Sequence, residues 1–153
     1  MRRAIFFMIS TALLALVVST PIIAKDLVYT NGQQLALDGY DPVAFFTDSK
    51  PVPGQSAITA THHGATYRFA SEANRTTFTA DPDRYAPQFG GFCAFGVSLG
   101  SLFPTKVETW QIIDGRLVLN KDLSIKKRFD KNKQKNLAKA DKEWPALLAK
   151  EGK

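Results

Sequence analysis

The chain has 153 residues, a formal net charge of +6 and a single cysteine. This length suits one compact domain, and one cysteine excludes an internal disulfide framework, so the hydrophobic core must stabilise the fold. Both methionines, Met1 and Met8, lie near the N-terminus. The remainder of the chain therefore has no thioether ligands, which excludes a methionine-rich copper(I) site.

The first 24 residues have the three-part pattern of a secretory signal peptide. Arg2 and Arg3 supply the positive charge, residues 5–18 are a nearly continuous apolar run, and Ala24 precedes a polar segment. The apolar run is shorter than the roughly 20 residues of a membrane-spanning helix. We therefore expect cleavage after Ala24 and export to the periplasm, leaving one domain at 25–153. An uncleaved signal that anchors the protein in the membrane is the alternative.

The first elements of the exported domain are short. Residues 27–30 are a strand candidate, followed by the turn dipeptide Asn31-Gly32. Asp41 before Pro42 is typical of a helix N-cap and first helical position, which predicts a helix over 42–46. Residues 47–55 contain two prolines and a glycine and are expected to form an exposed loop.

A hairpin and a helix are predicted next. The β-prone runs at 57–63 and 65–69 are separated by His63-Gly64, which favours a tight turn. Ser71 is a suitable cap for a helix over 72–79, with Phe78 on its buried side.

The centre of the chain contains the clearest hairpin. Before it, Asp81-Pro82 predicts a short helical turn that ends near Tyr85, and residues 100–105 are irregular. Two apolar runs, 110–113 and 116–119, then flank an Asp-Gly turn.

From residue 124 to residue 143 the spacing of apolar residues is helical. The predicted buried stripe consists of Ile125, Phe129, Leu137, Ala140 and Trp144. Pro145 is expected to end this helix. The predicted fold class is therefore α+β, a small antiparallel sheet with peripheral helices.

The same C-terminal region is strongly basic. Residues 121–142 contain nine lysines and arginines and three aspartates. The simplest interpretation is a solvated helix face. Contact with an anionic membrane surface or an acidic protein partner is the alternative. A nucleic acid partner is not expected, because the N-terminal pattern predicts export and the basic run lacks aromatics suited to base stacking.

Residues 90–96, Gly-Gly-Phe-Cys-Ala-Phe-Gly, place Cys93 among three glycines and two aromatics. Glycine permits positive φ and close approach to the backbone, so we expect a tightly turned, ligand-accessible loop. Three interpretations of Cys93 stay open: a small buried hydrophobe, a metal ligand acting with histidine, or a reactive or mixed-disulfide thiol.

His62 and His63 are the two histidines of the chain. Adjacent strand residues point to opposite faces, so both can bind one ion only if the strand ends between them. Gly64 keeps that arrangement open. Imidazole with thiolate suits copper or zinc, which makes Cys93, His62 and His63, with Asp41, candidate ligands of an open metal site. Surface or cross-strand histidines without a metal are the alternative.

Aromatic residues near the glycines suggest a ligand cleft. Tyr40, Phe45, Phe46, Phe89, Phe92 and Phe95 could line a small pocket near Cys93. We take Tyr40, Phe92 and Phe95 as candidate cleft residues, with core packing as the alternative. The chain has no phosphate-binding loop, serine elbow, His-Glu-x-x-His motif or dinucleotide fingerprint, so we expect a non-enzymatic binding protein. A thiol-dependent enzyme centred on Cys93 is the alternative.

Several ordered motifs resemble those of secreted YHS-domain proteins. They lie at residues 39–46, 67–75, 81–85, 90–96, 110–120 and 140–145. The resemblance covers residues 38–145 and implies a YHS-like α+β fold.

The wider YHS family, with the related TRASH domains, is associated with heavy-metal handling through cysteine ligands. Its core Phe-Cys-Ser-x-x-Cys-x-x-x-Phe aligns on Phe69, Ser71 and Phe78, which places Ala70 and Asn74 where two cysteines stand. The upstream cysteine is absent as well. The resemblance therefore implies that the usual metal site is lost, because thiolate supplies most of the affinity of such sites.

The function expected from the resemblance is accessory to copper or zinc handling, through Cys93 or through imidazole alone. A metal-free module that binds a small molecule or a protein at the Gly/aromatic cleft is the alternative.

Overall fold

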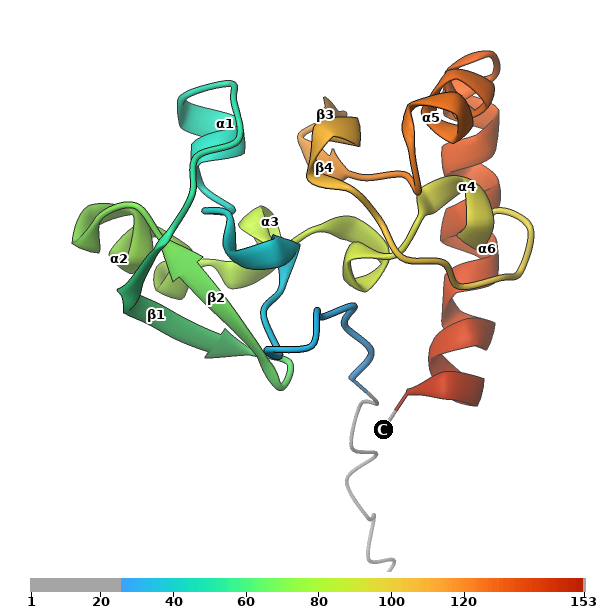
Figure 1. The fold of residues 1–153 in the computed structure, drawn as a ribbon. Coiled ribbons are helices and arrows are strands. Elements are labelled where there is room, and N and C mark those ends of the chain that lie inside the picture. The colour runs from blue at the N-terminus through green and yellow to red at the C-terminus, as the bar shows by residue number, and fades with distance from the viewer. Residues whose placement is uncertain (1–25, 153) are drawn as a thin grey trace, which may run out of the picture.

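The structure is a computed structural model that describes residues 26–152 (Figure 1). The expected signal peptide at 1–24, and its alternative as a membrane anchor, lie outside the described residues. Within residues 26–152, no helix combines the length and the apolar character needed to cross a membrane.

The fold is α+β, as predicted, but its strands form two separate antiparallel pairs. Strand β1 (Gln55–His62) pairs with β2 (Ala65–Phe69), and β3 (Gln111–Ile113) pairs with β4 (Arg116–Val118). Both predicted hairpins are confirmed. The expected single sheet is wrong, because no strand pairing joins the two hairpins within the described residues.

Short helices connect and flank these hairpins. In chain order they are η1 (Leu37–Gly39), α1 (Ala44–Thr47), α2 (Glu72–Ala80), α3 (Pro82–Tyr85), η2 (Gln88–Gly91), α4 (Ala94–Val97), η3 (Val107–Thr109), α5 (Leu123–Asp130) and α6 (Lys133–Glu151). The helices predicted over 42–46 and 72–79, and the short one that ends near Tyr85, are confirmed to within two residues.

Side-chain caps explain where several helices begin. The Ser71 hydroxyl accepts the N–H of Asn74 at 3.1 Å, which starts α2 as predicted. Asp122 does the same for α5 by accepting the N–H of Ile125 at 2.8 Å.

Three predictions of regular structure are wrong. The single helix expected from residue 124 to Pro145 is two helices, α5 and α6, separated at residues 131–132. Residues 27–30 are not a strand; Thr30 forms only an isolated bridge with Ala36. Pro145 lies inside α6 instead of ending it. A proline costs about 3 kcal/mol inside a helix. Buried contacts on either side offset that cost: the Trp144 ring lies 6.1 Å from Phe89, and Leu147 is buried.

The core consists of two hydrophobic clusters. The first joins the β1–β2 hairpin to α1 and α2, and its largest buried members are Tyr67, Phe45, Phe69 and Phe78. The second joins α4, α5 and α6 to the β3–β4 hairpin, and it includes Phe89, Val118, Phe129, Leu137 and Ala140. Four of the five residues predicted for the apolar stripe of the C-terminal helical region belong to this cluster or pack against it: Phe129, Leu137, Ala140 and Trp144. Ile125, the fifth, is half-buried and is not part of it.

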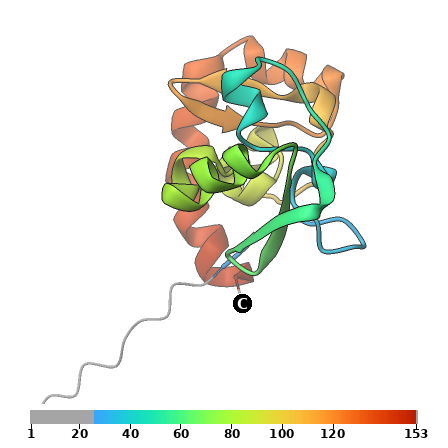
Figure 2. The ribbon, with the colours of Figure 1, turned by 90° about the vertical axis from the view of Figure 1, so that its left-hand side faces the viewer.

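The tip of the β1–β2 hairpin lies close to the C-terminal half of α6. Figure 1 shows the first described residues between these two elements, and Figure 2 shows both elements at the same end of the molecule. Residues of the hairpin turn and of α6 line one pocket. Segments that are remote in the sequence therefore meet at the hairpin turn.

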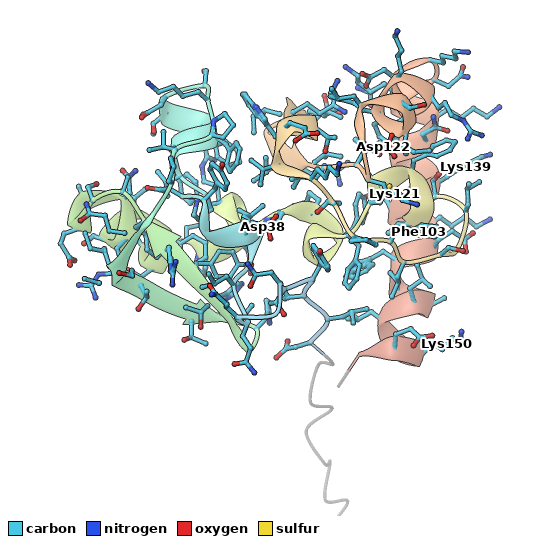
Figure 3. The ribbon with its side chains drawn as sticks, in the orientation of Figure 1. Asp38, Phe103, Lys121, Asp122, Lys139 and Lys150 are labelled. Carbon is cyan, nitrogen blue, oxygen red and sulfur yellow. The ribbon has the colours of Figure 1, made fainter. Side chains whose placement is uncertain are left out.

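The basic residues of 121–142 lie on α5 and α6, except Lys121 before α5 and Lys131 between the two helices. Lys121 lies with its ammonium 5.3 Å from the centre of the Phe103 ring, and Figure 3 shows this pair beside α4, with Lys139 on α6. Lys126 contacts Asp130 on its own helix at 2.6 Å, and Lys133 of α6 contacts the same carboxylate at 3.7 Å. A partner for this face, membrane or protein, stays a prediction.

Candidate metal centre

The turn of the first hairpin brings the two histidines together. Strand β1 ends at His62, and His63-Gly64 form the two-residue connection to β2. Both turn residues have positive φ, 49° and 74°, as in a type I′ turn. His63 therefore departs from strand alternation, and the two imidazole rings lie 3.9 Å apart between centroids. The condition for a shared ion, a strand that ends at this point, is confirmed.

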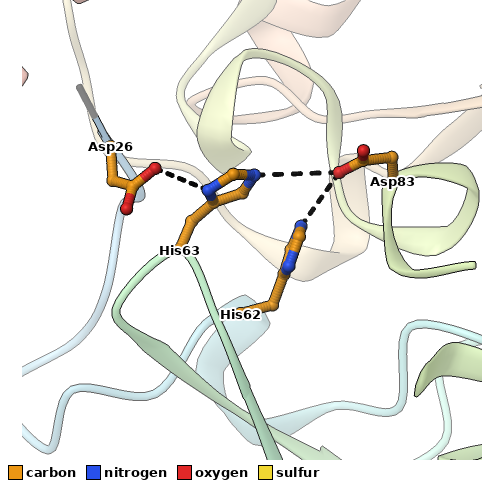
Figure 4. A network of polar contacts seen from close by, with 4 residues as sticks. All are labelled: Asp26, His62, His63 and Asp83. Atoms are coloured by element: carbon orange, nitrogen blue, oxygen red, sulfur yellow. Dashed lines mark hydrogen bonds and ion pairs between the residues drawn. The ribbon is translucent and has the colours of Figure 1, made fainter. Parts of the chain in front are cut away.

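Asp83, in the first turn of α3, completes a group of three metal-ligand donors. Its Oδ1 lies 3.0 Å from Nε2 of His62 and 3.7 Å from Nε2 of His63 (Figure 4). A tetrahedral ion bound at about 2.1 Å places its donors roughly 3.4 Å apart. One donor atom from each residue lies within 4.8 Å of the others, and no second group of this kind occurs in residues 26–152.

Asp26 orients one imidazole from the opposite side. Its Oδ1 lies 2.5 Å from Nδ1 of His63. A carboxylate can only accept, so Nδ1 carries the hydrogen, and the lone pair of Nε2 faces Asp83. Metal-ligating histidines usually donate their second ring N–H to a carboxylate in this way.

The other imidazole is held by aromatic packing. The side chain of His62 is 17% exposed, and its ring lies 6.0 Å from Phe78 and 6.5 Å from Tyr67. The Asp83 side chain, in contrast, is 82% exposed. The group is thus anchored on the hairpin side and open to solvent on the α3 side.

A glycine of the Cys93 segment allows Asp26 to reach the histidines. The N–H of Tyr29 donates to the carbonyl of Gly90 at 2.8 Å, which places residues 26–29 against η2. A Cβ built on Gly90 would lie 1.9 Å from the carbonyl oxygen of Leu27. Only glycine leaves room for this backbone contact.

A pocket of about 290 Å³ adjoins the donors. The four polar residues Asp26, His62, His63 and Asp83 lie on its lining. Its apolar wall comes from three separate segments and includes Leu27, Pro87, Phe89, Trp144 and Leu148.

Sequence reasoning identified the two histidines of this group but missed both aspartates. Asp83 reads as an ordinary acidic residue in the first turn of a helix, a common position that carries no metal signal. Asp26 lies 37 positions from His63, and only the docking of the N-terminal segment on Gly90 brings it close.

Cys93 lies in the core, 1% exposed, so the expected ligand-accessible loop is wrong. The thiol caps α4: its sulfur accepts the N–H of Gly96 at 3.4 Å and lies 3.7 Å from Oδ1 of Asn120. Burial raises the pKa of the thiol. Cys93 occupies the position of a small buried hydrophobe and is not part of the donor group.

Asp41 is also separate from the donor group, because its oxygens are used inside the fold. Oδ1 accepts the N–H groups of Val43 and Ala44, at 2.8 and 3.4 Å. Oδ2 accepts the N–H of Ala70 at 2.8 Å and an amide hydrogen of Asn74 at 2.7 Å. Ala70 and Asn74, the two positions that the resemblance aligns with cysteines, are therefore hydrogen-bonded to a buried carboxylate. The expectation that Asp41 adds a ligand to the histidines is corrected accordingly.

The candidate aromatic residues do not share one cleft. Tyr40 packs on the first cluster, whereas Phe92 and Phe95 pack on the second. The ring of Phe92 lies 5.7 Å from Tyr29, and the Arg128 guanidinium lies 5.2 Å from the centre of the Phe95 ring. The prediction of one cleft near Cys93 is wrong, because the chain distributes these rings over two cores.

Of the other three aromatics, Phe45 and Phe46 border a separate hollow next to Trp110. Phe89 is the only one of the six that lines the histidine pocket.

Comparison with known proteins supports one assignment. The sequence profile of the YHS domain matches residues 43–89, which run from the residue before α1 into η2. The matched segment contains His62, His63 and Asp83. Neither the curated proteins nor the solved structures include a significant match to this chain. Residues 43–89 of this chain are a YHS domain.

Proposed function

We propose that this protein binds one copper(II) or zinc ion through His62, His63 and Asp83. The convergence of two imidazole nitrogens and one carboxylate oxygen at ligand spacing carries the proposal. Imidazole is a good ligand for both ions, and neither ion needs a thiolate when several nitrogen and oxygen donors are present. The proposed ligands His62, His63 and Asp83 are at other positions than the cysteines of the domains that this chain resembles.

The site is suited to reversible binding. Structural zinc sites are usually closed by four protein ligands, whereas this group supplies three and leaves Asp83 largely exposed. An open position allows the ion to exchange with a partner or with a small ligand. We therefore propose a non-enzymatic accessory role in metal handling, in which the protein holds an ion and releases it.

The proposal includes export of the protein. The N-terminal pattern supports cleavage after Ala24, which would place Asp26 next to the new N-terminus. The mass of the protein isolated from the periplasm of its native cells tests this point. A mass that corresponds to residues 25–153 supports export with cleavage. A full-length protein in the membrane fraction contradicts cleavage after Ala24.

Isothermal titration of tagless protein with zinc and copper(II) tests the metal site. We expect one ion per chain for the unchanged protein. His62→Ala and Asp83→Asn should each weaken binding by at least about 100-fold, more than the roughly 10- to 100-fold effect of removing a group that only orients a ligand.

Asp81→Asn is the matched control for Asp83→Asn. It removes the same charge from an exposed residue two positions away that is not in the donor group. Equal affinities for all these variants would contradict the proposal, as would the absence of one-to-one binding in the unchanged protein.

A further inference from the structure

The pocket beside the donor group extends well beyond the space that an ion needs. Its volume is about 290 Å³. A cavity of about 150 Å³ holds a benzene molecule, so this pocket has room for a ligand with one or two rings. It lies just below the range of about 300–1,000 Å³ that is usual for small-molecule sites.

The far wall of the pocket is aromatic and is fixed by packing. The rings of Phe89 and Trp144 lie 6.1 Å apart in an edge-to-face arrangement. Phe89 has a φ of 55°, a left-handed conformation that is uncommon for a bulky residue. His63, also on the lining, has a positive φ of 49° that its type I′ turn requires, and five further described non-glycine residues with positive φ lie away from the pocket. Phe89 is therefore the one lining residue whose conformation is local strain of the kind found at binding sites.

The charge of the loaded site favours an anion at the open position. Two neutral imidazoles and the Asp83 carboxylate leave a divalent ion with one net positive charge. The Asp26 carboxylate balances this charge from the far side of His63, where it contacts Nδ1, so the open position on the ion itself still faces a net positive charge. Gln88 also lies on the lining and carries an amide that can form hydrogen bonds.

From these features we infer that the metal-loaded site binds a small aromatic carboxylate. One carboxylate oxygen takes the open position on the ion, and the ring lies against Phe89 and Trp144. This inference rests on the proposed metal site and names the class of ligand that the site accepts. Both parts of the ligand are needed: the anion for the metal and the ring for the apolar wall.

Titration calorimetry on the zinc-loaded protein tests the inference with three matched probes. Benzoate carries both parts, acetate carries only the carboxylate, and benzyl alcohol carries only the ring. We expect benzoate to bind at least about tenfold more tightly than either of the other two, because the ring adds buried apolar area to the metal contact. Without zinc, benzoate binding should be lost.

Two variants compare the loss of an aromatic ring that lines the pocket with the loss of a ring elsewhere on the surface. Trp144→Ala should reduce benzoate affinity to that of acetate while zinc still binds one to one. Phe103→Ala removes an exposed ring that does not line the pocket, and it should leave benzoate affinity unchanged.

The outcomes distinguish the two proposals. Zinc binding with benzoate no tighter than acetate overturns the aromatic ligand and leaves the metal site standing. Equal benzoate binding with and without zinc overturns the metal contact of the ligand. If zinc itself does not bind, the proposed function fails first.

Discussion

The glycine-rich segment around Cys93 and the His62-His63 turn differ in what their unusual residues accommodate. In the glycine segment the close approaches come from the chain itself: Gly90 faces the Leu27 carbonyl, and a Cβ on Gly96 would lie 2.6 Å from the Phe103 ring. At the turn, the left-handed conformation of a histidine directs a side chain toward another donor.

This difference shows that the space beside a glycine motif can be filled by another segment of the same chain and not by a ligand. The two regions are nevertheless connected, because Gly90 allows residues 26–29 to dock and Asp26 then contacts His63. The glycine segment therefore supports the histidine site without contributing a ligand to it.

The largest effect on the histidine site is expected from His63→Asn. Asparagine is favoured in the first position of a type I′ turn, whereas a histidine with positive φ costs roughly 1–3 kcal/mol. We expect zinc affinity to fall at least about 100-fold, while the free energy of unfolding stays equal or rises by up to about 1 kcal/mol.

Calorimetry and urea denaturation measure these two effects of His63→Asn separately. A parallel loss of stability and of zinc affinity would show that His63 is structural and not a ligand.

Gly90→Ala tests the connection between the two regions. The added Cβ collides with the Leu27 carbonyl, so the N-terminal segment should leave η2 and Asp26 should lose His63. Zinc affinity is expected to fall roughly 10- to 100-fold, the usual effect of losing a carboxylate that holds a histidine ligand in place.

Asp26→Asn supplies the comparison for Gly90→Ala. If both changes act through the same contact, their effects on zinc affinity should not add. The double variant should then have the same zinc affinity as the single variant with the lower affinity. Additive losses in calorimetry would show that Gly90 acts on the site by another route.

Cys93→Ala tests the opposite side of the comparison. Loss of a buried side chain that caps α4 should lower the free energy of unfolding by about 1–2 kcal/mol. Zinc affinity should not change, because the thiol is not in the donor group. A marked loss of zinc binding in a still-folded Cys93→Ala protein would restore the cysteine as a ligand.

The smallest expected effect is a dependence on alkaline pH. Burial raises the pKa of the Cys93 thiol in the folded chain above that in the unfolded chain. The folded state thus binds its proton more tightly, so the stability that Cys93 contributes is present below about pH 8.5 and is lost as the pH rises further. Tyr67, whose pKa burial also raises, contributes with the same sign at higher pH.

Urea denaturation between pH 7 and pH 9.5 measures this decline, and Cys93→Ala should show a shallower one. Alkylation of the native thiol should also be slow across this range and fast in the unfolded protein. Rapid alkylation of the folded protein at pH 7 is the result that contradicts the buried position of Cys93.

Much of the local structure follows from short-range chemistry. Ser71 caps α2, and the turns at His63-Gly64 and Asp114-Gly115 join their strands as predicted, because each depends on residues only a few positions apart. The prediction that Pro145 ends a helix is wrong because it considers only the local preference of proline. Packing of α6 on both sides of Pro145 outweighs that preference.

The YHS resemblance, the two hairpins, the short helices and the histidine pair can all be predicted from the amino-acid sequence. The burial of Cys93, the contacts of Asp41 with Ala70 and Asn74, and the approach of Asp83 and Asp26 to the histidines become visible only in the folded chain. These contacts join residues that are far apart in the sequence. A cap or a turn is complete within a few residues, whereas this candidate metal centre needs three segments that only the packed cores bring together.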